Sequence, residues 1–295
     1  MINNYLKYLC CPKCKADLLM SESQLICINC KGRFDIKQGI PVLIDLNNLP
    51  DHLSNQINYF EKELMNDKEG HEYLLKEWQN NYIERFNMSF PDISNKLVID
   101  CGTGTGYMAV ELAKKGAHLI ACDLTLKSLV RLKNIIDKLG LSDRFTFACC
   151  SADNLPFKEG IADYFISNAV LEHIPNESLA IHEINRVCKL TAGMMITVPL
   201  SFKYLNPLLI PVNYIHDKRI GHLRRYDDDI LRSKFNNWSL LRSYFTGHFS
   251  KVLKVLFNGV IQVFNEVTIE KIDKINEHNK LGASNVIGMF ERVKK

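Results

Sequence analysis

The chain has 295 residues with a formal net charge of +4 at pH 7, and 46% of its residues are hydrophobic. This is the composition of an ordinary soluble globular protein with room for one large domain and a small one. The mild positive charge permits contact with an acidic surface or RNA without arguing for either. No apolar run approaches the roughly eighteen residues that a membrane span requires, and the start, MINNYLKYLCCPKCK, lacks a signal-peptide core. We therefore expect a cytoplasmic protein, and peripheral contact with a membrane is left open.

The first notable feature along the chain is a cluster of cysteines. Two CxxC pairs, Cys11 with Cys14 and Cys27 with Cys30, flank a polar turn at Ser21-Glu22-Ser23 that predicts a hairpin. Four thiolates at this spacing are typical of a closed, structural zinc site. We expect Zn to stabilise a module spanning residues 1–45, because so short a segment buries too little apolar surface to be stable alone.

This module resembles a known one. LCCPKCKADL followed by LICINCKGRFDIKQGIPVLI is similar to the zinc ribbon of the small activator subunits of tRNA and protein methyltransferases. Similar ribbons are fused to the front of many bacterial methyltransferases. The resemblance implies that a methyltransferase domain follows.

Residues 46–95 are polar and predict a linker with one helix. Leu75, Trp78, Tyr82 and Phe86 recur at spacings of three and four, which gives that helix one apolar face. Two interpretations remain open: a helix packed on the next domain, or a helix that caps a ligand cleft.

From residue 96 onward, short apolar strands alternate with amphipathic helices. The pattern predicts strands over 97–100, 118–122, 145–149, 164–167 and 194–198, with helices over 107–115, 126–139 and 176–190. Leu126, Leu129, Leu132, Ile136 and Leu139 are expected to face inward on the second of these helices. Such alternation indicates an α/β fold with a mostly parallel sheet, in which ligands bind at the carboxyl ends of the strands.

The stretch VIDCGTGTG lies where the first of these strands ends. Gly102, Gly104 and Gly106 allow unusual dihedral angles and let backbone N–H groups approach a ligand. The spacing departs from the GxGxxG fingerprint of dinucleotides. Asp100 suits a cationic group, and Asp123, at the end of the second strand, suits the hydroxyls of a ribose. S-adenosylmethionine (SAM) offers both an ammonium and a ribose.

These strand ends, with SADNLPF and ADYFISNAVLEHIP, resemble class I SAM-dependent methyltransferases, in particular the branch of quinone-pathway and other small-molecule enzymes. The resemblance covers about residues 96–199 and implies a Rossmann-like fold with a seven-stranded sheet. It implies that the three glycines and Asp100 bind the methionine part of SAM, Asp123 the ribose and Leu124 the adenine. The remaining cofactor positions carried over are Ser151, Ala152, Asp153 and Asn168. Where the family usually has an adenine-contacting Asp, this chain has Ser151, so either Ser151 or Asp153 makes that contact.

The catalytic and acceptor candidates follow the fourth and fifth strands. His173 and His222 are candidates for accepting a proton, and a base is needed only for a protonated acceptor. Arg224, Arg225 and Tyr226, in GHLRRY, are candidates for binding an anionic acceptor. The alternative is a salt-bridged loop that leads into a helix at residues 228–235.

The last third completes the expected domain over residues 96–295. Residues 238–245 predict the sixth strand, and residues 285–293 predict an antiparallel strand at the sheet edge. Insertions are expected at about 200–226 and 250–279. The second of these is helical and strongly apolar, and its expected roles are covering the cleft, forming a homodimer or touching a membrane.

Together these features predict a SAM-dependent methyltransferase acting on a small-molecule or lipid-like acceptor. One alternative is an rRNA or tRNA methyltransferase that recognises RNA through its ribbon, although no basic stripe with interleaved aromatics is present. Another is a non-catalytic SAM-binding partner protein. We also expect chelation of zinc to unfold the ribbon and leave SAM binding largely intact.

Overall fold

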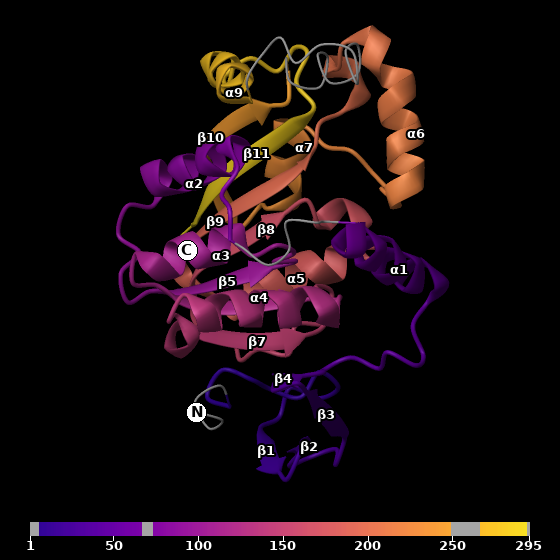
Figure 1. The fold of residues 1–295 in the computed structure, drawn as a ribbon, viewed down its shortest axis with the longest axis vertical. Coiled ribbons are helices and arrows are strands. Elements are labelled where there is room, and N and C mark those ends of the chain that lie inside the picture. Colours follow the sequence, from indigo (N-terminus) through magenta and orange to yellow (C-terminus); the bar gives the residue numbers. More distant parts are fainter. Residues whose placement is uncertain (1–5, 67–72, 249–265, 294–295) are drawn as a thin grey trace.

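The structure is a computed structural model that describes residues 6–66, 73–248 and 266–293. A small four-stranded antiparallel sheet lies at one end of the molecule, beside a larger sheet of seven strands (Figure 1). The strands of the small sheet are β1 (Leu18–Ser21), β2 (Gln24–Cys27), β3 (Arg33–Lys37) and β4 (Ile40–Pro41). The strands β1 and β2 form the predicted hairpin, whereas β3 and β4 were not predicted.

The seven-stranded sheet has the order β10-β11-β9-β8-β5-β6-β7. This is the expected Rossmann-like α/β arrangement with a mostly parallel seven-stranded sheet. The strands β5 to β9 run parallel to one another, and β11 is antiparallel to both of its neighbours. The strands are β5 (Leu97–Cys101), β6 (His118–Asp123), β7 (Phe145–Cys149), β8 (Ala162–Asn168), β9 (Cys188–Pro199), β10 (Trp238–Thr246) and β11 (Asn285–Arg292).

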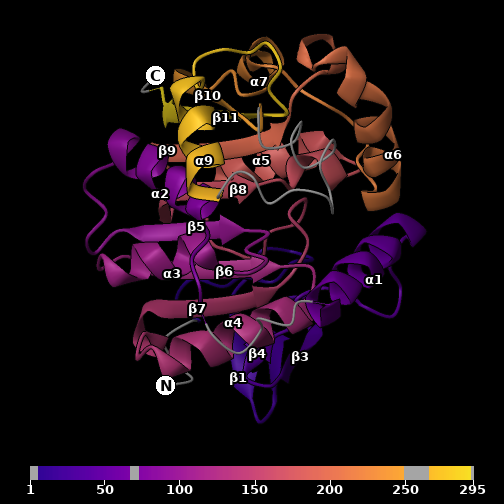
Figure 2. The same cartoon turned by 45° about the horizontal axis from the view of Figure 1, so that its top comes forward.

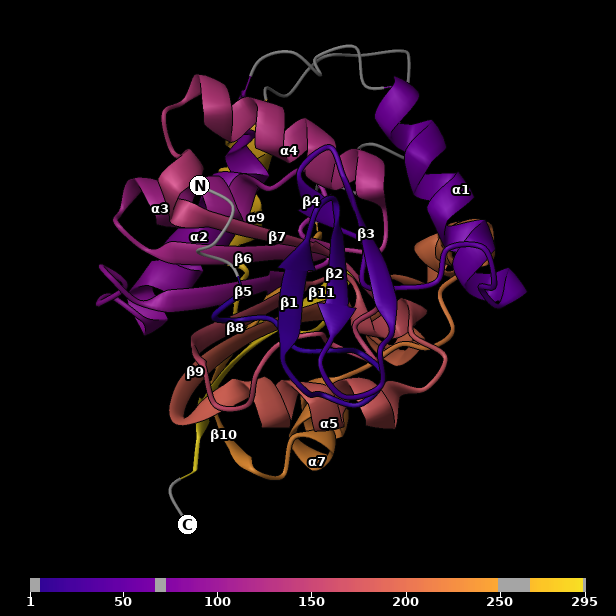
Figure 3. The ribbon, with the colours of Figure 1, turned by 90° about the horizontal axis from the view of Figure 1, so that it is seen from below.

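Helices cover both faces of this sheet (Figure 3). One face packs against α2 (Glu77–Ser89), α3 (Tyr107–Lys114) and α4 (Leu126–Lys138), and the other against α5 (Glu177–Val187) and α7 (Asp228–Lys234). Successive residues of β5 alternate between the two cores: Val98 faces the α2 side and Ile99 the α5 side. Among the described residues, the other α-helices are α1 (Asp51–Asn66), α6 (Ile210–Ile220) and α9 (Glu266–Ile275).

The small sheet shares the core on the α5 face. Leu9, Leu18 and Leu25 are buried in the same apolar cluster as Phe157 and Ile184 of the large domain. Backbone pairing continues this contact, because Leu43 N donates to Cys149 O of β7 over 2.8 Å. Seen from below, the small sheet covers the β7 end of the large sheet (Figure 3). The ribbon and the large domain therefore share one continuous apolar core.

Three expectations for the large domain were wrong. The strand β11 is antiparallel but lies between β9 and β10, so β10 is the edge. The predicted helix over 176–190 ends at Val187, because Cys188 pairs with Ala162 and begins β9. Leu139 is 40% exposed, and Ile135 takes the buried position instead.

The structure describes the two expected insertions to different extents. The first contains α6, and most of the second (249–265) lies outside the described residues; α9 is its described helix. Within the described parts of the chain, every helix is too short or too polar to cross a bilayer.

Candidate functional site

The glycine turn connects β5 to α3, and the space around a side chain differs from one of its three glycines to the next. All three have positive φ angles. A Cβ on Gly102 would lie 2.2 Å from Val170 Cγ2, and one on Gly106 would lie 2.3 Å from Leu132 Cδ1. A Cβ on Gly104 would have Gly102 O, at 3.9 Å, as its nearest neighbour. Gly104 therefore faces open space, whereas Gly106 is required by the packing of α4 and does not line the site.

Two acidic side chains stand at the ends of β5 and β6. Asp100 is buried and accepts a hydrogen bond from Thr103 Oγ1 over 2.7 Å, and burial raises its pKa to about 7. Asp123 accepts hydrogen bonds from the N–H groups of Gly104 (3.0 Å) and Thr125 (2.8 Å). Burial also raises the pKa of Asp123, and these backbone donors oppose that rise. Both carboxyl groups are held in place by the turn they flank.

A pocket of about 400 Å³ opens at these strand ends. Its walls bring together predicted cofactor residues from four strand ends, namely Gly102, Gly104, Asp123, Leu124, Ser151, Ala152 and Asn168. Asp153 does not line the pocket; its carboxylate accepts a hydrogen bond from Ser151 Oγ over 2.5 Å. The geometry thus favours Ser151 as the side chain that faces a ligand, with Asp153 orienting it from behind.

The helix α1 covers one side of the first pocket. This helix was not predicted from the sequence. Leu53, Gln56 and Phe60 line the cavity, and α1 lies beside the end of α4 (Figure 2). Gln56 Nε2 donates to Ile220 O over 2.8 Å, which attaches α1 to the C-terminal end of α6. The signal was present: Leu53, Ile57, Phe60 and Leu64 recur at helical spacing within a polar stretch.

A second pocket, of about 360 Å³, adjoins the first and shares Gly102, Gly104 and Asn168 with it. The helix α2 supplies Trp78 and Tyr82 to its wall, and β5 supplies Asp100. On the predicted apolar helix, Tyr82 and Phe86 are buried in the core, and Trp78 and Tyr82 line the second pocket. Leu75, expected on the same helix, precedes its first residue.

Asn168 lies where the two pockets meet. Its Nδ2 donates to Tyr107 Oη over 2.5 Å, which directs the side chain towards α3. Thr197 Oγ1, in the wall of the second pocket, is buried and has no hydrogen-bond partner among the described residues. An unpartnered hydroxyl in a pocket wall is suited to contacting a polar ligand group.

His173 and His222 lie next to each other, with ring centroids 4.7 Å apart. His173 lines the first pocket, and burial together with His222 lowers its pKa to about 3, so its imidazole is neutral at pH 7. Its Nδ1 atom has no partner among the described residues. His222 is set back from the pocket: its Nδ1 is 2.8 Å from Asp217 Oδ1, and its Nε2 is 3.5 Å from Glu172 Oε1.

The carboxyl groups around His222 have opposite pKa shifts. Burial raises the pKa of Glu172 to about 8. The pKa of Asp217 is lowered to about 2, because hydrogen bonds from His222 and Arg225 outweigh the effect of burial. Asp217 is therefore the permanent anion of this cluster.

The arginines of GHLRRY are engaged within the protein. Arg224 donates to Ile174 O (2.6 Å) and Pro175 O (3.1 Å). Arg225 forms two hydrogen bonds to the carboxylate of Asp217, at 2.6 and 2.8 Å. Tyr226 is 1% exposed. These contacts support the salt-bridged-loop alternative, in which the segment positions His222, over direct contact with an anionic acceptor.

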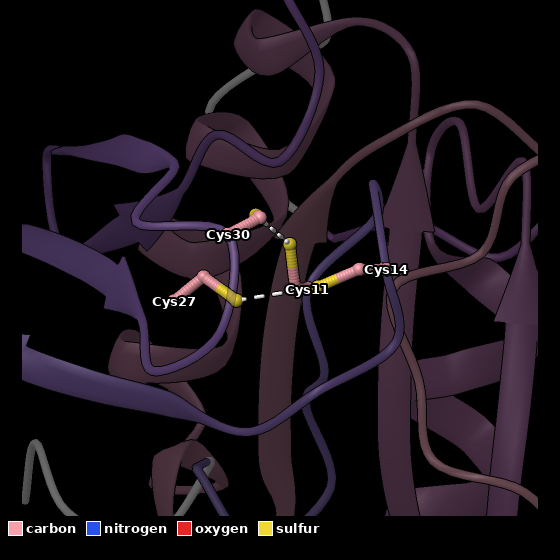
Figure 4. A group of neighbouring side chains, drawn as sticks. All are labelled: Cys11, Cys14, Cys27 and Cys30. Atoms are coloured by element: carbon pink, nitrogen blue, oxygen red, sulfur yellow. Dashed lines mark hydrogen bonds between the residues drawn. The ribbon is translucent and has the colours of Figure 1, made fainter.

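The four cysteines of the ribbon converge in space (Figure 4). The Sγ atoms of Cys11 and Cys30 are 3.6 Å apart, and those of Cys14 and Cys27 are 3.4 Å apart. Sulfur ligands about 2.3 Å from a tetrahedral zinc lie at nearly this separation. The donor set therefore fits zinc, whose binding here remains a proposal. Cys10, the extra cysteine, points elsewhere and donates to Phe157 O over 3.1 Å.

Comparison with known proteins agrees with this geometry. Residues 99–195 match the family model described as "Methyltransferase domain". The chain is 29% identical over 122 residues to a ubiquinone/menaquinone biosynthesis C-methyltransferase of Rickettsia typhi, covering 39% of this chain and 47% of that one. It is 33% identical over 78 residues to a tRNA 5-carboxymethoxyuridine methyltransferase of Escherichia coli, covering 26% and 30%. The chain thus spans about half the length, or less, of these curated relatives.

Solved structures extend the likeness to the whole fold. A geranyl diphosphate C-methyltransferase from Streptomyces coelicolor has a TM-score of 0.63 at 11% identity, covering 83% of this chain and 99% of that one. The [4+2]-cyclase SpnF has a TM-score of 0.58 at 16% identity, covering 83% and 98%. At such identities the likeness concerns the fold alone. Residues 99–195 are therefore similar to a methyltransferase domain, and the chain has the fold of known methyltransferase structures.

Proposed function

We propose that the chain is a SAM-dependent methyltransferase that acts on a small-molecule or lipid-like acceptor. One observation carries the proposal: the glycine turn, Asp123 and Ser151 meet at the wall of one pocket, and a second pocket adjoins it at Asn168. The space of the two pockets together can hold a cofactor along the strand ends with an acceptor next to it.

The residues present fit SAM. The bare backbone at Gly104 leaves room for a ligand against the turn, and Asp123 is oriented by two backbone N–H groups so that it can accept hydrogen bonds from ribose hydroxyls. Leu124 supplies an apolar surface for the adenine. When bound, SAM supplies an electrophilic methyl group on a sulfonium sulfur.

The protein's own contribution is alignment and exclusion of water. The helix α1 covers the first pocket with Leu53 and Phe60, which shields the reacting groups from solvent. His173 lines the first pocket with a neutral imidazole, which can accept the proton of a hydroxyl acceptor. His222, held by Asp217, packs against His173 and fixes the orientation of its ring. Zinc in the ribbon is structural, because four thiolates leave no open coordination position.

The alternative acceptor is RNA, and the similarity to a tRNA methyltransferase supports this alternative. The side of the first pocket that α1 forms is apolar, with Leu53 and Phe60, and this side next to the cofactor favours a small or lipid-like acceptor instead.

The experiment that tests the proposal incubates the full chain with methyl-labelled SAM and fractionated host extract. We expect label in the small-molecule or organic-extractable fraction, and much less of it when Asp123→Ala replaces the wild type at the same SAM concentration. Asp143→Ala, an exposed acid away from the pocket, is the matched control and should label normally. Label in RNA would overturn the small-acceptor proposal. SAM binding without labelling of any fraction would support a non-catalytic partner protein.

A further inference from the structure

The loop of residues 150–158, between β7 and β8, has two faces. On one face, Cys150, Ser151 and Ala152 line the first pocket. Cys150 N also donates to Asp123 O over 3.0 Å, which links this loop to the end of β6. Any shift of the loop would therefore change the pocket at both Ser151 and Asp123.

The other face of the loop is held by the ribbon. Lys158 N donates to Tyr8 O (2.9 Å), and Cys10 N donates to Pro156 O (2.8 Å). Cys10 Sγ adds a hydrogen bond to Phe157 O. The ribbon thus contacts the backbone of successive loop residues on the side opposite the pocket.

Lys15 makes the most extensive of these contacts. Its Nζ lies 2.8 Å from Asn154 Oδ1, 3.0 Å from Leu155 O and 2.9 Å from Glu183 Oε2. An ammonium has three protons, so three acceptors use its full donor capacity. Glu183 is buried and belongs to α5, so Lys15 joins the ribbon, the loop and the large domain at one point.

The position of Lys15 depends on the cysteine site. Lys15 directly follows Cys14, has a positive φ of 58°, and donates from its backbone N–H to Cys11 O over 2.8 Å. Its backbone therefore belongs to the same turn that brings the Sγ atoms of Cys11 and Cys14 towards those of Cys27 and Cys30 (Figure 4). A metal bound to these four sulfurs would hold the turn closed.

We propose that the ribbon sets the affinity of the cofactor pocket, with Lys15 as the positioning residue that transmits the state of the cysteine site to the loop 150–158. This inference rests on SAM being the ligand of the first pocket. It replaces the expectation that removing zinc leaves SAM binding intact.

The test compares two lysines of the same turn in the full chain. Lys15→Met removes the three contacts, whereas Lys13→Met changes an exposed neighbour. SAM affinity measured by calorimetry should fall about fivefold for Lys15→Met, because the loop that carries Ser151 loses a partly exposed ionic anchor, and should stay within about twofold for Lys13→Met. Lys15→Arg keeps the charge and several donors and should retain most of the affinity.

Amide hydrogen exchange gives a readout that general destabilisation would not reproduce. In Lys15→Met, exchange should speed up in residues 150–158 while β5 and β8 remain as protected as in the wild type. Zinc content should equal that of the wild type, because the cysteines are unchanged. Unchanged SAM affinity in a folded Lys15→Met variant would overturn the proposal. A wild type that fails to bind SAM would instead overturn the proposed function.

Zinc removal supplies an independent arm. Chelation should lower SAM affinity of the wild type at least as much as Lys15→Met does, and added zinc should restore it. In Lys15→Met the same treatment should have a smaller effect, because the two perturbations act on one link and are not additive. Full additivity would contradict the role given to Lys15.

Discussion

The glycine turn after β5 and the GHLRRY segment before α7 are both short motifs that the sequence analysis assigned to ligand binding. They differ in whether their polar groups face a pocket or are bound within the protein. The turn leaves Gly104 beside open space and directs Asp123 to a pocket wall. In the GHLRRY segment, Arg224 donates to a backbone carbonyl oxygen and Arg225 donates to the carboxylate of Asp217. The difference teaches that a charged motif becomes a binding site only where the fold leaves its donors without internal partners.

The largest effect should come from breaking the internal network of the segment. Asp217→Asn removes the charge that holds His222 and Arg225 in a mostly buried site. We expect the free energy of unfolding at pH 7 to fall by about 2–3 kcal/mol, because a buried cation loses its counter-ion. Urea denaturation measures this, with the exposed Asp143→Asn as control. A loss no larger than that of the control would mean that the segment is free to bind a ligand.

The same pair predicts a pH dependence. The folded-state pKa of Asp217, about 2, lies below the ordinary value of about 4. A lowered pKa gives stability that is present above the unfolded value and is lost as the pH falls through the folded value. The wild type should therefore lose stability between about pH 4 and 2 more steeply than Asp217→Asn. Parallel curves for the two proteins would contradict the assigned shift.

Within the turn, Gly106→Ala should cost more stability than Gly104→Ala. The new Cβ at position 106 would meet Leu132, which is fully buried, and both positions have positive φ. We expect a loss of about 2–3 kcal/mol at position 106 from overpacking and strain, and about 1 kcal/mol at position 104 from strain alone. Thermal unfolding of both variants checks this order. Equal losses would show that α4 moves aside without cost.

Asp123→Ala should act on binding more than on stability. We expect SAM affinity to fall at least about tenfold, since the hydrogen bonds to the ribose are lost and the N–H groups of Gly104 and Thr125 lose their acceptor. Calorimetry with SAM measures the change, with Asp143→Ala again as control. Unchanged affinity would remove Asp123 from the cofactor site.

The sequence by itself determined the parts of the protein whose signal is local. The strand β7 was predicted with both of its bounds, and β5, β6 and α3 were predicted to within one residue, because short apolar strands before turns and amphipathic helices have distinct periods. The four cysteines were paired by spacing alone, and the structure brings their sulfurs together.

Tertiary structure decided what depends on contacts between distant segments. The strand β11 inserts between β9 and β10, and nothing in its own residues specifies those neighbours. The helix α1 is amphipathic, but only its packing against α4 and its hydrogen bond to Ile220 place it over the first pocket. Lys15 looks like a solvated lysine in the sequence, and its three acceptors come from residues more than a hundred positions away. Local periodicity specifies elements, whereas the partners of a side chain are set only when the elements pack.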